Sequence, residues 1–181
     1  MEIKKLAHNA LNFGINKFIE ILGIGIVVIG ALLLLSLMSF SPDDPNFIFP
    51  EKTIIKNLLG YHGSFSSDFF FQSFGLISFL VPFSLISTGI NIFSNKKIFL
   101  LIESNFFTIL YLLFGSLFFS FFYANAFELH INGNGGFIGN YLGNTFLISL
   151  IGLNSIVAYY FLLLVVLSFF LVSIQFKIIF L

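Results

Sequence analysis

Long stretches without charged residues, separated by short polar segments, divide this chain. Three of them, Ile21–Pro42, Phe69–Asn95 and Ser104–Phe127, each have the length of one membrane crossing. A helix needs about 20 apolar residues to cross the hydrocarbon core of a bilayer. The fourth stretch, Leu129–Phe176, is too long for one helix and has to be divided. The pattern predicts four transmembrane helices at about 21–38, 72–93, 105–126 and 156–174.

The weakest helical point of the fourth stretch lies at residues 152–155, which read Gly-Leu-Asn-Ser. Ahead of this point, small and polar residues recur at helical spacing, with apolar residues on the opposite side. This pattern predicts an amphipathic helix over about 136–151, which either lies at the membrane interface or is partly inserted. The fold class is therefore all-α: a polytopic membrane protein with four spans and a Gly-rich amphipathic helix before the last one. The small and polar positions are Gly136, Gly139, Asn140, Gly143 and Asn144.

Glycines spaced four apart, Gly135, Gly139 and Gly143, form a smooth ridge on this helix, with Asn140 and Asn144 beside it. Such a ridge lets another helix approach closely, which supplies much of the association energy inside membranes. It can pack against a neighbouring protein or within the same bundle, and the pattern does not choose between the two. In either case we expect Gly139→Leu to disturb packing, and Phe137→Leu, on the other face, to be mild.

A proline lies in the middle of the second predicted span. Pro82 removes a backbone hydrogen bond, so it predicts a kink in that helix. A gate around a substrate is the alternative interpretation, but no ionisable residue lies within this span. We therefore favour an ordinary membrane kink, whose freed carbonyl is satisfied by neighbouring groups.

The predicted outer loop, 39–68, opens with a rigid acidic turn. Its prolines fix φ, and its serine and aspartates can bond nearby backbone amides. A site for a cation or a partner is one interpretation. A helix terminator in the headgroup region is the favoured one, because two adjacent aspartates make a poor ion site. The residues of the turn are Ser41, Pro42, Asp43, Asp44 and Pro45.

Lysine placement predicts the orientation in the membrane. If the N-terminus is cytosolic, six of the lysines fall on the cytosolic side and two, Lys52 and Lys56, fall outside. Four spans then place both termini in the cytosol, as a segment 1–20, a membrane domain 21–176 and an end 177–181. The six inner lysines are Lys4, Lys5, Lys17, Lys96, Lys97 and Lys177.

Composition removes several functional classes. The chain is 58% hydrophobic and 9% charged, its formal net charge is zero, and it has no cysteine. Clustered basic residues for DNA and a phosphate-binding loop are both lacking, so we expect no direct nucleic-acid contact, no ATPase activity and no catalytic site. The three histidines, His8, His62 and His130, are far apart in sequence, and we expect no metal and no cofactor.

Three segments resemble the N-terminal four-helix membrane region of the FtsK/SpoIIIE family of bacterial DNA translocases. The first is Ser39-Phe40-Ser41-Pro42-Asp43-Asp44-Pro45-Asn46, where the first span ends. The second is Phe71-Gln72-Ser73-Phe74-Gly75-Leu76, with Pro82 and Gly89 downstream. The third is Gly135-Gly136-Phe137-Ile138-Gly139-Asn140-Tyr141-Leu142-Gly143, ahead of the last span.

The resemblance implies a membrane anchor and interaction module of a DNA translocase that acts in cell division and chromosome partition. It implies a place in the bacterial inner membrane, at the division septum. The partners expected from it are the lipid bilayer, further copies of the chain and membrane proteins of the division machinery. The family's ATPase would lie downstream, so the chain is either a fragment, as its apolar ending favours, or a short relative. A small channel or transporter, or a structural subunit of another membrane complex, is the alternative.

Overall fold

Helices make up all the regular structure in the described part of the chain. The computed structural model describes residues 2–46, 54–124, 132–145, 152 and 154–176, with side chains from residue 8 onward. No strand occurs among these residues, so the predicted all-α class is confirmed. The elements are α1 (Glu2–Met38), α2 (Gly60–Phe74), the 3-10 helix η1 (Gly75–Leu80), α3 (Val81–Asn95), α4 (Phe99–Phe122), α5 (Gly136–Gly143) and α7 (Ser155–Ser173).

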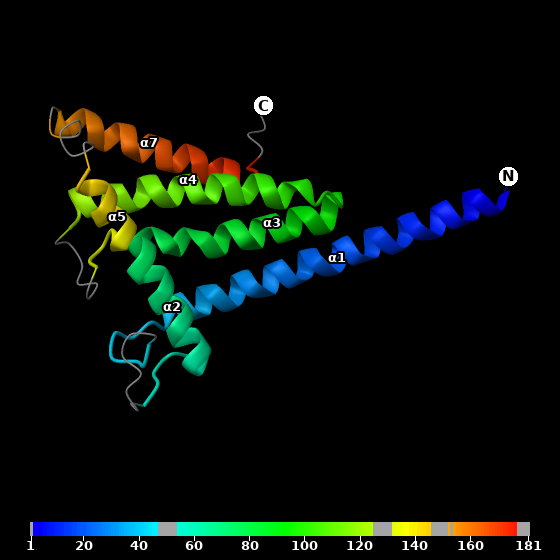
Figure 1. Ribbon diagram of the computed structural model, residues 1–181, viewed down its shortest axis with the longest axis horizontal. Helices are drawn as coiled ribbons and strands as arrows, with labels where there is room; N and C mark the ends of the chain where they lie inside the picture. Colours follow the sequence, from blue (N-terminus) through cyan, green and yellow to red (C-terminus); the bar gives the residue numbers. More distant parts are fainter. Residues whose placement is uncertain (1, 47–53, 125–131, 146–151, 153, 177–181) are drawn as a thin grey trace.

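Four helical stretches are long and apolar enough to cross a membrane, as predicted: His8–Met38, Gly60–Asn95, Phe99–Phe122 and Ser155–Ser173. Helix α1 packs on α3, α3 on α4, and α4 on α7, so the spans follow one another in a row (Figure 1). The short helices α2 and α5 lie at one end of this row, which we call the loop end. The opposite end holds the connection from α3 to α4 and is called the turn end.

Two glycines bring the backbones of α1 and α3 together. A Cβ atom added to Gly89 would lie 2.6 Å from the carbonyl oxygen of Gly23 and 2.7 Å from Cγ2 of Val27. A Cβ added to Gly23 would in turn lie 2.8 Å from the carbonyl oxygen of Gly89. Since lipid supplies no hydrophobic drive between helices, this close backbone contact is what holds the first span to the second.

Hydroxyl groups join the next three helices. Ser84 of α3 lies 2.7 Å from the Oγ of Ser173 in α7 and 3.1 Å from the Tyr111 hydroxyl in α4. One turn further along α3, the Thr88 hydroxyl donates to Ser104 of α4 at 2.5 Å. All five side chains are buried. Each hydroxyl therefore finds a partner inside a bundle that offers it no water.

The helix of the second span is broken at Gly75, and it is not kinked at Pro82. Its helix changes to 3-10 geometry at Gly75, which has φ 72° and ψ −150°, and resumes as α-helix at Val81. Pro82 stands in the first turn of α3, where a missing N–H leaves no bond unmade. The change of direction therefore begins at Gly75, upstream of the predicted kink. Helix α2 crosses the row at a steep angle as a result (Figure 1).

The element boundaries differ from the predicted ones at both ends of the row, and the largest difference is the start of α1, at Glu2 rather than 21. Helix α2 begins at Gly60, inside the segment predicted as the outer loop 39–68. Helix α4 begins at Phe99 rather than 105, so Glu103 lies within it. Helix α5 covers Gly136–Gly143, and residues 146–151 of the predicted amphipathic helix lie outside the described residues.

Ion pairs mark the turn end. Glu20 of α1 bonds Lys17 at 2.6 Å and Lys96, just after α3, at 2.9 Å. From Glu20, α1 continues to Met38 without a charged residue. At 1.5 Å per residue this segment is roughly 28 Å long, close to the thickness of the hydrocarbon core. Glu20 and Lys96 thus lie near one membrane boundary, and the acidic turn after Met38 lies near the other.

Candidate interaction site at the loop end

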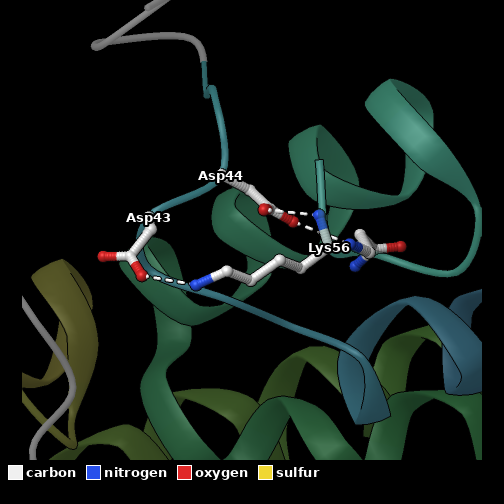
Figure 2. A network of polar contacts seen from close by, with 4 residues as sticks. Asp43, Asp44 and Lys56 are labelled. Atoms are coloured by element: carbon white, nitrogen blue, oxygen red, sulfur yellow. Dashed lines mark hydrogen bonds and ion pairs between the residues drawn. The ribbon is translucent and has the colours of Figure 1, made fainter. Parts of the chain in front are cut away.

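The acidic turn is fastened to the start of α2. Asp44 is buried, and its two carboxylate oxygens accept the backbone N–H groups of Lys56 and Asn57, each at 2.8 Å (Figure 2). Asp43 is exposed and bonds the Lys56 ammonium at 2.8 Å. This hydrogen bond raises the pKa of Lys56, so the lysine stays charged through the neutral range. The two adjacent aspartates therefore hold backbone and lysine groups of their own chain.

Asn57 extends the fastening to the end of α1. Its side-chain amide donates to the carbonyl oxygens of Ser36, at 2.9 Å, and of Ser39, at 3.3 Å. The Ser36 hydroxyl donates to the carbonyl oxygen of Gly63 in α2 at 2.6 Å. The last carbonyls of a helix have no partner within it. Here the Asn57 amide supplies a partner for two carbonyls at the end of α1, while α2 accepts the Ser36 hydroxyl in return. A terminator role for the acidic turn stays a prediction.

The two aspartates should differ in their weight for stability. Replacing Asp44 with alanine leaves the N–H groups of Lys56 and Asn57 without an acceptor, so we expect Asp44→Ala to lower the free energy of unfolding by about 2 kcal/mol. The control Asp43→Ala removes only an exposed ion pair, which contributes about 0–1 kcal/mol. Denaturant titrations of both variants in detergent micelles measure the difference. Equal losses would show that the buried carboxylate is not the fastener.

A second contact at the loop end joins the break in the second span to the segment before α5. The backbone N–H of Leu76 donates to the carbonyl oxygen of Asn134 at 2.9 Å. A Cβ added to Gly75 would collide with that same carbonyl, and one added to Gly136 would lie 2.6 Å from the backbone nitrogen of Gly75. The Gly-rich segment thus passes directly against the broken helix, and glycine is required on both sides of the contact.

Side chains close this contact around its edges. The amide of Asn132 donates to the Oε1 of Gln72 at 3.1 Å, and the Ser116 hydroxyl of α4 donates to the carbonyl oxygen of Phe74 at 2.8 Å. The amide of Asn134 donates to the carbonyl oxygen of Tyr123 at the end of α4, at 2.6 Å. Three separate segments are therefore held at one point.

The glycine ridge of α5 packs against α4 of the same chain. A Cβ added to Gly139 would collide with the carbonyl oxygen of Ser116, and one added to Gly135 would lie 2.5 Å from the Cβ of Ser120. Gly143 has more room, since its added Cβ would lie 3.6 Å from the Ser120 hydroxyl. The ridge thus makes a contact within the bundle, and packing against a neighbouring protein stays a prediction. Gly139→Leu should therefore push α5 away from α4.

The asparagines beside the ridge have separate tasks. The Oδ1 of Asn140 accepts the Ser120 hydroxyl at 2.9 Å, while its amide donates to the carbonyl oxygen of Asn132 at 2.8 Å. Asn144 follows the last residue of α5, and its N–H donates to the carbonyl oxygen of Asn140 at 3.0 Å. On the opposite face, the exposed rings of Phe137 and Tyr141 stack with centroids 6.3 Å apart.

Several contributors to this end were missed from the sequence. Gly75 belongs to the second segment of the family resemblance, and Asn134 belongs to the Gly-rich segment before α5. The glycine between Phe74 and Leu76, inside an apolar stretch, is a usable signal for a helix break. Asn57 and Ser116 carry no such signal, because their partners are far away along the chain. The predicted residues of the acidic turn and of the glycine ridge lie in two separate contacts, the first near the start of α2 and the second near its end.

The chemistry available here is packing and hydrogen bonding. Within the part of the chain that the structure describes, no group of three histidine, cysteine or acidic side chains could hold a metal ion. The acidic and amide groups of the loop end are used in fastening the chain to itself. What the loop end presents outward is aromatic, on α2 and on α5, and includes Tyr61, Phe65, Phe69, Phe137 and Tyr141.

These features define a multi-pass membrane domain of four spans, whose helices α2 and α5 are held by hydrogen bonds and by close backbone contacts at glycines. The chain matches, over residues 16–180, the model of the family described as the 4TM region of DNA translocase FtsK/SpoIIIE. It belongs to that family, and the resemblance stated from the three segments is confirmed.

Individual relatives match over a shorter region. The DNA translocase FtsK of Rickettsia bellii (strain RML369-C) is 35% identical over 85 residues, which are 45% of this chain and 11% of that protein. The DNA translocase FtsK of Rickettsia prowazekii (strain Madrid E) is 35% identical over 82 residues, 44% of this chain and 11% of that protein. The match therefore spans about a tenth of the length of these relatives. No solved structure matches the chain significantly.

Proposed function

We propose that this chain is the membrane anchor and interaction module of a DNA translocase that acts in cell division and chromosome segregation. The observation that carries the proposal is the family match over residues 16–180, which covers the last three spans and the first from residue 16 onward. The anchor lies in the bacterial inner membrane at the division septum, with both termini cytosolic. Its partners are further copies of the chain and membrane proteins of the division machinery, and it makes no direct contact with DNA.

The buried polar groups support an anchor rather than a channel or transporter. Among the described residues, the hydroxyls inside the bundle are bonded to one another, as between Ser84 and Ser173 and between Thr88 and Ser104. A transport path would instead present polar groups to a water-filled cavity or an ion. The chain itself carries no catalytic activity, and the motor's ATPase is supplied by another part of the translocase.

The cytosolic position of both termini follows from the lysine distribution and is directly testable. A reporter that is active only outside the cytosol should stay silent when it is fused after Leu181. The same reporter inserted at residue 50, in the predicted outer loop, should be active. An active fusion at Leu181 would require an odd number of crossings and would contradict the proposed anchor.

The anchor role itself is tested by exchange. The N-terminal membrane region of a relative DNA translocase is replaced by this chain, and the chimera carries a fluorescent protein. We expect a fluorescent band at the septum and normal chromosome segregation in dividing cells. Membrane fluorescence spread evenly around the cell, with protein levels unchanged, would overturn a role in septal recruitment while leaving the membrane insertion intact.

A further inference from the structure

The first part of α1 extends beyond the turn end of the row, where no other described helix accompanies it (Figure 1). Its apolar side chains have no cover from the rest of the chain. Leu11 is 65% exposed, Ile15 55% and Phe18 64%, all on one side of the helix, and Phe13, on the other side, is 66% exposed. An apolar strip of this kind in water is costly, at roughly 25 cal/mol for each Å². Something therefore covers it in the membrane-bound protein.

The segment is amphipathic. Apolar and small residues occupy Ala10, Leu11, Gly14, Ile15 and Phe18, at spacings that place them on one side of a helix. Polar residues occupy the other side, at His8, Asn9, Asn12 and Asn16.

The surface of the bilayer is close enough to cover the apolar strip. Glu20, paired with Lys17 and Lys96, lies near the membrane boundary, so the apolar strip begins within one turn of the headgroups. A groove of about 510 Å³ runs along the strip and ends at Ile98, at the turn end itself. The apolar surface of the segment is thus continuous with the lipid-facing surface of the first span.

Charge at this end suits a lipid surface. Lys17 is half exposed, and its ammonium, which also pairs with Glu20, lies over the ring of Phe13 at 5.8 Å from the ring centroid. Lys96, which bonds Glu20, and the adjacent Lys97 lie at the same end. Lysines whose stems cover apolar surface while their ammonium groups reach headgroups are typical of interfacial helices.

Gly14 supplies a place where the helix can turn onto the surface. A Cβ added there would meet nothing within 4 Å, so no packing holds this point straight. Glycine also weakens a helix relative to alanine, by about 1 kcal/mol. We infer that residues 8–18 form a surface segment of the anchor, which lies on the adjoining leaflet with its apolar strip in the lipid and its asparagines in water.

Spin labels test this inference directly, because the chain has no cysteine of its own. The full chain is reconstituted in vesicles of phosphatidylethanolamine and phosphatidylglycerol, with one label in each of four variants. Ala10→Cys and Leu11→Cys report the apolar strip, and Asn12→Cys and Asn16→Cys report the polar side. Power saturation then measures collisions with oxygen, which enters lipid, and with a nickel complex, which stays in water.

We expect the ratio of oxygen to nickel collisions to be severalfold higher at residues 10 and 11 than at residues 12 and 16. Four equally water-accessible labels would overturn the inference, since the segment would then project into water. Labels on the strip that are immobile and reached by neither reagent would also overturn it, because the strip would then be covered by protein, such as a second copy.

A pair of charge variants sharpens the result. The double variant Leu11→Glu, Ile15→Glu places two carboxylates on the strip. The ratio of oxygen to nickel collisions at the residue 10 label should then fall to the value of a label in water. Asn12→Glu with Asn16→Glu adds the same charge to the polar side and should leave that label in lipid. Neither pair touches the four-span row, so a failure of this inference leaves the proposed anchor role untouched.

Discussion

The variant Gly89→Leu should separate the first two spans. A Cβ at this position would lie 2.6 Å from the carbonyl oxygen of Gly23 and 2.9 Å from the backbone nitrogen of Val27, and a leucine adds three more carbons. Backbone atoms of two packed helices cannot yield as the end of a flexible side chain does. Overpacking costs about 1–3 kcal/mol in a protein core, and we expect the upper end here, about 3 kcal/mol. Unfolding with sodium dodecyl sulfate in mixed micelles measures it.

The matched control for this variant lies on α1. Gly25 is two residues from Gly23, and a Cβ added there would meet nothing within 4 Å. Gly25→Leu adds the same side chain to a similar helix but places it in lipid, so its unfolding curve should match that of the parent. If Gly25→Leu and Gly89→Leu were equally destabilised, glycine itself rather than the helix crossing would be responsible.

The variant Gly75→Ala should release the Gly-rich segment from the broken second span. At φ 72° and ψ −150° the backbone of Gly75 is in a region that only glycine enters readily, and forcing another residue there costs about 1–3 kcal/mol. The added methyl group would also collide with the carbonyl oxygen of Asn134. Together these effects should cost at least about 3 kcal/mol and break the bond from the Leu76 N–H to that carbonyl.

Gly133 separates the two causes. It also has a positive φ, 66°, but a Cβ added there would meet nothing within 4 Å. Gly133→Ala should therefore cost only the conformational strain, about 1–2 kcal/mol. Amide hydrogen exchange of Leu76 should be much faster in Gly75→Ala and close to the parent rate in Gly133→Ala. Unchanged exchange in Gly75→Ala would mean that the segment and the helix break are not coupled.

The four spans were predictable because each is a long apolar stretch, and lipid tolerates little else. Helix α2 was not, since Gly60–Phe74 mixes serines, His62 and Asp68 with aromatic rings and resembles a loop. Its start is held by the bonds of Asp44 and Asn57, and its Ser64 hydroxyl donates to the carbonyl oxygen of Pro45. Those contacts join segments that are far apart in the chain.

For the glycine ridge, too, the sequence predicts the packing surface but not the segment that packs on it. Spacing alone identified Gly135, Gly139 and Gly143 as a packing surface, and the helix on which they lie is present. Spacing could not identify the partner, because the Ser116 and Ser120 backbone that fills the ridge has no feature of its own in an apolar run. The pairing of Gly23 with Gly89 is hidden for the same reason, because nothing in the sequence distinguishes either from the other glycines of its span, such as Gly25.

The row of spans also determines how the domain would carry a mechanical load. A pull on the chain beyond Phe176 enters through α7, which lies alongside α4 and reaches α3 only near Ser173. Because the pull runs along the helix axis, the contacts of α7 with its neighbours are sheared together rather than opened one after another. The bond nearest the pulled end runs from the Gln175 amide to the carbonyl oxygen of Leu100 and bears the force first. The next are the bond from the Ser87 hydroxyl to the carbonyl oxygen of Ile174 and the bond between Ser84 and Ser173. Drawing α7 out would also drag its exposed leucines and aromatic rings through the headgroups, so lipid and protein resist the same displacement.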